Sequence, residues 1–389
     1  MKKFLALLLV LFFSINFYSQ EKKKIIPKLD IGGALRFNYN LSSWKPGQKD
    51  RGGDFGFDLF RINVKAEKNK VKLNVEYRLY SSGFGGGMLK QGWVAYDFSD
   101  KNALQIGLSQ VPFGITQYNS HNWFFSLNYY VGLEDDHDMG VKFQHQGDKW
   151  DYDLAFFKNS EELNFGSYSD VSNSRYSYDV SSIDLDGDGV LDLRNKEINQ
   201  VNGRVVFKFG NDKVKHRLGT SIQYGGLYNL DTKKTGHHYA FAGHYEMASK
   251  KLKLKLQVAN YKNKAKNPNN QPSDVIAMTA YGAPYLIASE GLLYTAGVAY
   301  TIPVEWKPIS SLQVYNDFGM MEKPNISFET SYMNVLGVLV TAGNVYTYID
   351  FAAGKNQPWL GGVWTRALAE GTPNENWEMR FNINIGYYF

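Results

Sequence analysis

The stretch Lys70–Arg78, KVKLNVEYR, alternates strictly between polar and apolar residues. Every even-numbered position carries a charged or amide side chain, and the odd-numbered positions are Val, Leu, Val and Tyr. Successive side chains of a β-strand point to opposite faces, so this segment would have one polar and one apolar face. The stretch therefore predicts a strand that separates water from an apolar phase.

Three further segments repeat the alternation: Arg61–Glu67, Lys251–Val258 and Arg380–Phe389. The expected strands are longer than the roughly five or six residues usual in globular proteins. Tight turns and long loops alternate between them, and the chain ends on an aromatic strand, as outer-membrane proteins do. These features favour a transmembrane antiparallel β-barrel over a soluble β-sandwich, which would also alternate.

We expect about 16 strands, a size that leaves an aqueous channel, with about 18 as the alternative. The apolar segment Asp274–Ser289 is the ambiguous one. As an additional strand it would break the alternation of turns and loops, so we assign it to a long folded loop, 264–290. The tight turns, expected on the periplasmic side, are at Asn69, Ser99–Lys101, Gly147–Asp148, Asn211–Asp212 and Ser249. The expected strands are 28–41, 54–67, 70–82, 89–98, 102–109, 137–146, 149–158, 197–210, 213–228, 235–248, 250–263, 291–302, 309–322, 326–340, 343–353 and 376–389.

The N-terminus has the pattern of a secretory signal peptide. Lys2 and Lys3 precede the apolar run Phe4–Phe13, which is too short to span a bilayer, and a charged stretch begins at Glu21. We expect residues 1–20 to be removed and residues 21–389 to form a single barrel domain. A retained N-terminal membrane anchor is the alternative. After the leader, no apolar run is long enough for a transmembrane helix.

Composition excludes several classes of function. The 389 residues include no cysteine, which excludes disulfides, thiol chemistry and cysteine-ligated zinc. The formal charge of +5 becomes +3 without Lys2 and Lys3, too small to indicate nucleic-acid binding. The 27 Tyr, 25 Phe and 37 Gly suit alternating strands with aromatic residues at the membrane interfaces. The expected partners are outer-membrane lipid and small hydrophilic solutes.

The polar positions of each strand should face the lumen, because apolar side chains cover the outside. The acids expected there are chiefly Glu67, Glu76, Asp97 and Asp153, and bases outnumber them. A positive lumen concentrates anions, so we expect a porin that prefers anions; some bases at strand ends would instead contact lipid headgroups. The expected lumen bases are Arg36, Arg61, Lys65, Lys70, Lys72, Arg78, Lys142, Arg204, Lys208, Lys251, Lys253, Lys255 and Arg380.

Four motifs resemble the phosphate-selective porin O/P family. They are QIGLSQVPFG at 105–114, EDDHDMG at 134–140, DFAAGKNQPW at 350–359 and the strand start Leu59–Arg61. The resemblance covers essentially the mature chain. It implies a sixteen-stranded trimeric porin with loops folded into the pore, and anion transport. Lysines stand at most candidate positions of the family's phosphate-binding arginine ladder, so the ladder is not carried over residue by residue.

The loop 110–136 is the expected constriction of the pore. It carries Gln117, His121, Asn122 and Trp123, and its end is the acidic run Glu134–Asp138. That run would either bind a cation or form salt bridges that fix the loop to the barrel wall.

A calcium-loop pattern occupies Asp184–Asp192, DLDGDGVLD. Oxygen ligands at positions 1, 3, 5, 7 and 9 with glycine at position 6 follow the EF-hand order. Position 12 is Asn195, where glutamate is expected, and Glu197 is a possible substitute. We expect a structural Ca²⁺ in an extracellular loop; a solvated hairpin tip is the alternative. The ligands would be Asp184, Asp186, Asp188, the Val190 carbonyl and Asp192.

No constellation in the sequence indicates an enzyme. Of the seven histidines, His238 and His244 share a strand face, but no serine or acid lies at a spacing from them that would indicate a catalytic site. The glycine-rich Gly83–Gly87 lacks the lysine and the helix of a phosphate-binding loop. The alternatives to a porin are therefore a binding or adhesion barrel with a loop-plugged lumen, a surface enzyme and a channel for hydrophobic solutes.

Overall fold

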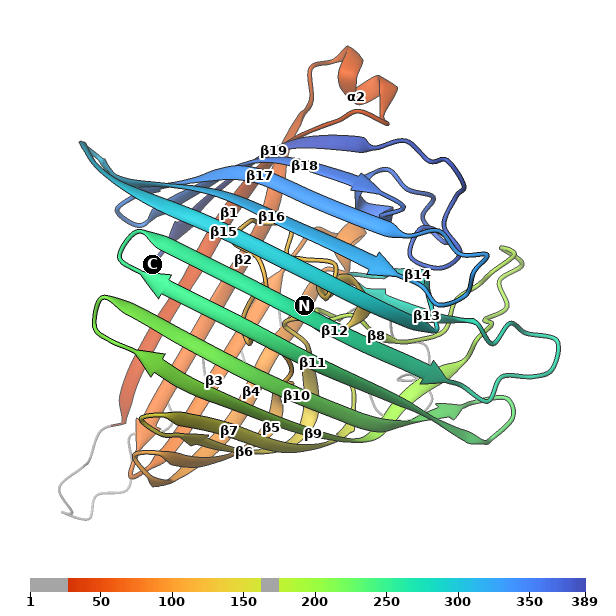
Figure 1. Ribbon diagram of the computed structural model, residues 1–389, viewed down its shortest axis with the longest axis horizontal. Helices are drawn as coiled ribbons and strands as arrows, with labels where there is room; N and C mark the ends of the chain where they lie inside the picture. Colours follow the sequence, from red (N-terminus) through yellow and green to blue (C-terminus); the bar gives the residue numbers. More distant parts are fainter. Residues whose placement is uncertain (1–26, 162–174) are drawn as a thin grey trace, which may run out of the picture.

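The structure is a computed structural model that describes residues 27–161 and 175–389. The expected signal peptide, 1–20, lies outside these residues. Sixteen antiparallel strands close into a barrel, in which each strand pairs with its neighbours in sequence and β1 pairs with β19 (Figure 1). The predicted fold class and strand number are therefore confirmed.

The barrel strands agree closely with the expected ranges. They are β1 (Lys28–Ser42), β2 (Asp54–Lys68), β3 (Val71–Leu79), β4 (Gly87–Ser99), β5 (Asn102–Gln110), β6 (His137–Gln146), β7 (Trp150–Asn159), β9 (Asn195–Gly210), β10 (Val214–Asn229), β11 (Thr235–Ser249), β12 (Leu252–Lys264), β15 (Glu290–Trp306), β16 (Ile309–Glu322), β17 (Ser331–Ala342), β18 (Val345–Lys355) and β19 (Glu378–Tyr388). Short helices lie in the connections: α2 (Pro46–Asp50), η2 (Ser82–Phe84), η3 (Tyr129–Val131) and η5 (Pro358–Leu360).

On the barrel strands the apolar side chains are exposed and the polar ones are buried, the reverse of the pattern in a soluble protein. In β7, Trp150 and Leu154 are 51% and 59% exposed, whereas the intervening Asp151 and Asp153 are 8% and 7% exposed. An exposed apolar band around the outside and polar side chains inside are what a lipid-embedded barrel requires. In the described part of the chain, no helix is long and apolar enough to cross a membrane.

Short turns join the strands at one end of the barrel, and the longer connections lie at the other end (Figure 1). Between β2 and β3, Asn69 and Lys70 have φ of +50° and +67°. Two consecutive residues with positive φ make the tight hairpin turn whose twist matches that of the flanking strands. The short-turn end is the periplasmic one, and the long loops are extracellular.

The barrel closes where the aromatic C-terminal strand meets β1. Gly33 and Phe389 exchange two backbone hydrogen bonds, of 2.9 and 3.2 Å. A Cβ on Gly33 would lie 2.5 Å from the Arg61 carbonyl oxygen and 2.6 Å from the Phe389 ring, so only glycine fits here. Closure leaves no unpaired strand edge in the membrane.

The ambiguous segment Asp274–Ser289 does not join the barrel wall. It forms a hairpin of β13 (Val275–Ala280) and β14 (Ala283–Ala288), and β13 also pairs with β8 (Asp179–Val180) of the preceding long loop. This three-stranded inner sheet is almost entirely buried. Its apolar residues pack against loop 111–136 and against inward side chains of the wall, including Tyr261 and Tyr315. The main hydrophobic core therefore lies inside the barrel.

Most strand boundaries agree with the expectation to within two residues, and the larger differences are at the end of β3, the end of β15 and the start of β17. The strand expected from residue 326 begins at Ser331, because the Asn325 side chain accepts a hydrogen bond from the backbone N–H of Ser327 (3.1 Å) and bends the chain into a turn. Lys251 lies in the turn before β12, where the hydroxyl of Ser249 accepts the N–H of Leu252 (2.9 Å).

A charge on the lipid-facing surface should destabilise the barrel. Ile222, in the middle of β10, is 55% exposed on the outer face. Ile222→Lys is expected to lower the free energy of unfolding in lipid vesicles by about 2–4 kcal/mol, as for a lysine near the bilayer midplane. Ile222→Leu is the control and should unfold like the parent protein in urea. Equal midpoints for the lysine variant and the control would contradict a lipid-facing position.

Candidate functional site

Loop 111–136 is folded into the barrel and is held by the wall at its beginning. The backbone N–H of Gly114 donates to Ser221 Oγ on β10 (3.0 Å), and the N–H of Ile115 donates to Gln257 Oε1 on β12 (2.8 Å). Arg204 Nε on β9 donates to the Gly114 carbonyl (2.8 Å). Gly114 has φ +58°, and a Cβ there would lie 2.3 Å from Gln257 Oε1. The glycine of the VPFG motif is therefore required by both its conformation and its surroundings.

The middle of the same loop is fixed to β12 and to β16, two strands further along the wall. Asp317 on β16 accepts hydrogen bonds from the backbone N–H groups of His121 (2.8 Å) and Asn122 (3.1 Å), and its other oxygen contacts His121 Nδ1 at 2.8 Å. Lys255 Nζ on β12 donates to the carbonyls of Tyr118 and Ser120, at 2.8 and 2.9 Å. The loop therefore crosses the lumen with its backbone tied to several strands.

The acidic run at the end of the loop divides into separate roles. Glu134 accepts hydrogen bonds from Asn119 N (2.9 Å) and Ser126 Oγ (2.5 Å), and burial raises the pKa of its carboxyl to about 7. Asp135 forms a 2.6 Å ion pair with Lys90 on β4, which is the salt-bridged anchor considered from the sequence. Asp136 instead faces other carboxyls, and burial together with those neighbours raises its pKa well above the usual value.

Four extracellular loops share the core above this constriction. Tyr129 and Tyr281 join loop 111–136 to the β13–β14 hairpin through their hydroxyls (2.6 Å). Trp359 Nε1 donates to the Tyr178 hydroxyl (2.6 Å), which connects the last long loop to the one that carries β8. Tyr285 donates to the carbonyl of Tyr130 (2.6 Å). Together these contacts make one assembly inside the extracellular half of the barrel.

Several of the expected lumen bases bind the folded loops. Lys142 Nζ donates to the carbonyl of Gln110 (2.6 Å), and Arg204 and Lys255 hold the loop carbonyls described above. The Arg380 guanidinium lies over the rings of Trp44 and Phe124, at 5.1 and 6.0 Å. Arg78 lies 4.4 Å from the Tyr176 ring centroid and forms an ion pair with Glu76. These bases act as anchors of the loops.

The remaining expected bases line the wall or the periplasmic mouth. Four of them have acidic partners: Arg36 with Asp58 (2.9 Å), Arg61 with Glu76 (3.6 Å), Lys72 with Asp97 (2.6 Å) and Lys208 with Asp151 (2.7 Å). Lys65 and Lys253 are exposed near the periplasmic ends of β2 and β12, and Lys70 and Lys251 lie in the turns. Neither Lys65 nor Lys253 forms an ion pair with any residue of 27–161 or 175–389.

Two inward charges were missed from the sequence because β-bulges reverse the alternation. Lys90 is the extra residue where Glu76 pairs with Gln91 but Tyr77 pairs with Leu89. Asp58 is the extra residue where Arg36 pairs with Leu59 but Phe37 pairs with Phe57. A bulge places one unpaired residue in a strand and shifts all later side chains to the other face. Only the improbability of a lysine facing lipid could have indicated from the sequence that Lys90 points inward.

The expected calcium loop is compact and exposed. Ligand atoms of Asp184, Asp186 and Asp188 all lie within 4.8 Å of one another. The carboxylate of Asp184 accepts the N–H groups of Gly187 (2.7 Å) and Gly189 (3.0 Å). Val190 is exposed, and Asp192 pairs with Ile183 through the backbone and accepts from Gln271 Nε2 (3.1 Å). Glu197 does not substitute at position 12: it is buried and accepts the N–H of Val180 (3.0 Å).

Replacement of Gly114 should release the start of loop 111–136. Gly114→Ala adds a methyl group against Gln257, beyond the roughly 1–2 kcal/mol that alanine loses in a left-handed conformation. Hydrogen exchange of the amides in 111–136 is therefore expected to accelerate. Gly343→Ala is the matched control, because Gly343 has the same φ of +58° in a periplasmic turn with nothing within 4 Å of its Cβ. Equal exchange in both variants would show that Gln257 does not hold the loop.

Comparison with known proteins agrees with this architecture. The family model described as phosphate-selective porin O and P matches residues 30–316. A search of curated proteins finds no matching sequence. The anion-selective porin from Comamonas acidovorans is similar in structure, with a TM-score of 0.54, 12% identity and coverage of 94% of this chain and 100% of that one.

Two further solved structures are similar over comparable lengths. The outer-membrane channel DcaP of Acinetobacter baumannii has a TM-score of 0.56, 9% identity and coverage of 96% of this chain and 100% of its own. The trimer form of OmpT from Vibrio cholerae has a TM-score of 0.54, 14% identity and coverage of 93% and 99%. Sequence identities this low show only that the fold is shared. The family model, in contrast, matches most of the barrel sequence. The chain therefore belongs to the phosphate-selective porin O and P family, whose members are non-enzymatic channels, and it is an integral β-barrel of the outer membrane.

Proposed function

We propose that the barrel is a passive channel for small hydrophilic solutes and that it prefers anions. The observation that carries this proposal is a basic wall on adjacent strands. Arg61 on β2 and Arg36 on β1 keep part of their side chains exposed, and the buried loop anchor Arg78 on β3 lies directly opposite Arg61. Guanidinium groups remain charged at any physiological pH and bind carboxylates and phosphates through two parallel hydrogen bonds.

The acids on this wall reduce its charge without cancelling it. Glu76 contacts both Arg61 and Arg78, so one carboxylate is shared by two guanidinium groups. Further along the path, the exposed amines of Lys65 and Lys253 add positive charge near the periplasmic mouth. A charged, narrow passage with low-dielectric walls concentrates counter-ions, which favours entry of anions. Phosphate and small organic anions both fit this chemistry, and the family name supports the first.

We also propose that the channel is a homotrimer. The support is the structural similarity to an outer-membrane protein of Vibrio cholerae that is described in a trimer form. Cross-linking of the folded protein in membranes, followed by electrophoresis, would distinguish a trimer from a monomer.

A loop-plugged barrel that binds an external partner is the second candidate. It is favoured by the inner sheet and loop 111–136, whose shared hydrophobic core occupies the extracellular half of the barrel. In that case the basic residues would serve only to hold the loops. The two functions differ in whether the folded protein conducts ions.

Measurement of the reversal potential across a potassium chloride gradient in a planar bilayer tests both candidates. We expect stable conductance with preference for chloride. Lys65→Glu combined with Lys253→Glu should shift the reversal potential toward cation preference, because it replaces two inward positive charges by negative ones. Preference for potassium in the parent protein would contradict the anion proposal. The absence of conductance from folded trimers would favour the plugged barrel.

Lys68→Glu is the matched control for charge reversal. Lys68 is also at the periplasmic end of β2, but it shares the outward face with Ile62, three positions beyond Lys65. It is expected to leave ion selectivity nearly unchanged. An equal shift in the control would mean that surface potential, and not the lumen, sets the selectivity.

We further propose that Asp184–Asp192 binds a structural Ca²⁺ on the extracellular side. The support is the EF-hand order of oxygen ligands and the close approach of three carboxylates. Ca²⁺ is expected to protect this loop from proteolysis, and Asp184→Asn with Asp186→Asn should abolish the protection. Cleavage that is insensitive to Ca²⁺ in the parent protein would contradict this proposal.

A further inference from the structure

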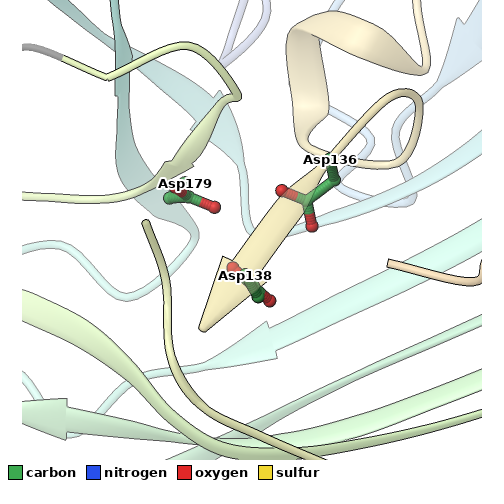
Figure 2. A group of neighbouring side chains, drawn as sticks. All are labelled: Asp136, Asp138 and Asp179. Carbon is green, nitrogen blue, oxygen red and sulfur yellow. The ribbon is translucent and has the colours of Figure 1, made fainter. Parts of the chain in front are cut away.

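A second group of carboxylates lies deep inside the barrel and is distinct from the Asp184–Asp192 loop. It consists of Asp136 at the end of loop 111–136, Asp138 at the start of β6 and Asp179 in β8, and their exposed fractions are 5%, 1% and 1%. Ligand oxygens of the three side chains all lie within 4.8 Å of one another. Figure 2 shows the three carboxylates gathered around one space, with Asp136 and Asp179 turned toward each other.

The hydrogen bonds around this group leave oxygen atoms unused. Asp138 accepts from Gln200 Nε2 (3.1 Å), and Arg175 pairs with Asp179 (3.2 Å). Among the described residues, however, Asp136 Oδ1 and Asp138 Oδ1 have no hydrogen-bond donor, although both atoms are buried. Buried polar atoms are nearly always partnered, and an ion is one of the few explanations for an exception.

A neutral oxygen independently points to the same place. Thr279 on β13 lies directly opposite Asp179 in the β8–β13 register, so the two side chains share one face of the inner sheet. Its hydroxyl is completely buried and has no hydrogen-bond partner among the described residues. A threonine hydroxyl beside carboxylates is a suitable additional oxygen ligand for a hard cation.

The charge of the surroundings favours a cation. Glu161 and Glu197 lie close enough to Asp136 and Asp138 to interact electrostatically with them, and Arg175 offers a single positive charge to this group. Carboxylates in a buried environment are stable as ions only when they are paired or bind a metal. The excess of carboxylates over the guanidinium group provides the negative charge that a divalent cation would balance.

Among the common divalent cations, the coordination geometry favours Ca²⁺. Ca²⁺ accepts oxygen ligands at about 2.3–2.6 Å in flexible geometry, so two ligands on opposite sides of it are about 4.6–5.2 Å apart. Mg²⁺ requires about 2.0–2.1 Å and a nearly ideal octahedron. The three oxygens are close enough to share one ion, and side chains from three separate elements suit the flexible geometry of Ca²⁺ better than a rigid octahedron.

We propose that Asp136, Asp138 and Asp179 bind one Ca²⁺ inside the barrel, with the Thr279 hydroxyl as a further ligand. This ion joins the constriction loop, the barrel wall and the inner sheet at a single point. It therefore holds the inward loops in place and sets how far the lumen is occluded. The site is separate from the exposed Asp184–Asp192 loop, which would bind its ion on the surface.

The test uses the full mature chain folded in detergent and freed of divalent cations with EDTA. The Asp184→Asn, Asp186→Asn variant removes the surface carboxylates from an exposed loop and leaves the barrel interior intact. Calorimetric titration of this variant with Ca²⁺ is expected to show one remaining site. Terbium should occupy the same site and luminesce through the neighbouring Tyr178. A folded variant that binds neither ion would overturn the proposal.

Additional substitutions then locate the remaining site. In the same background, Asp138→Asn should weaken Ca²⁺ binding by about 10- to 100-fold or more, since changes even outside the ligand shell have effects of that size. Thr279→Val keeps every carboxylate and the side-chain volume, and it should weaken binding to a smaller extent. If Asp138→Asn fails to fold, Thr279→Val still tests whether Ca²⁺ binds at this site. Unchanged affinity in the folded variants would place the ion elsewhere and refute the assignment.

The functional consequence is measured in the same background. Removal of Ca²⁺ with EDTA is expected to accelerate hydrogen exchange of residues 111–136 and to increase the noise of the channel current. Mg²⁺ at the same concentration should not reverse these changes. If EDTA leaves the exchange of loop 111–136 unchanged, the carboxylates are held by shared protons, and the ion has no role in fixing the loops.

Discussion

Every backbone polar group inside the bilayer must find a hydrogen-bond partner within the protein, and the rest of this structure depends on that constraint. Sixteen strands satisfy it by closing β1 onto β19, at the seam where Gly33 and Phe389 exchange hydrogen bonds. Closure of an up-and-down barrel with an even strand number brings both ends of the barrel sheet to the short-turn side. All long connections must then emerge on the other side, where they are free to fold inward.

A barrel of this size is too wide for wall side chains alone to fill it. The extracellular loops fill part of the remaining space. Tyr129, Tyr178 and Tyr285 are almost completely buried in the core that these loops share. Backbone that leaves regular structure inside a membrane protein needs polar partners. Arg204, Gln257 and Asp317 provide them from the wall. The extracellular half of the lumen therefore resembles a protein interior.

The inward charges consequently serve two purposes in different places. Beside loop 111–136, Lys90 and Lys255 bind groups of the loop. Toward the periplasm, Lys65 and Lys253 remain exposed, and on the wall Glu76 shares its charge between two arginines. Buried carboxylates at the start of β6 have the opposite sign from this wall. If both proposals hold, this separation of charge would let one lumen attract anions and also bind a cation that organises its loops.

The barrel could be predicted from the amino-acid pattern alone, because a period of two over long segments such as Lys70–Arg78 reports directly which face meets lipid. The sequence also indicated which loop folds into the barrel, since the glycine of VPFG and the acidic run are local features. Which bases hold the loops became clear from the folded chain alone, because that depends on loop carbonyls far away in the sequence, such as Gly114 for Arg204. The bulges at Asp58 and Lys90 were not predicted, because an expectation of strict alternation makes no allowance for one extra residue in a strand. Likewise, Asp136 and Asp179 are 43 positions apart in number and meet only when two loops fold into one lumen.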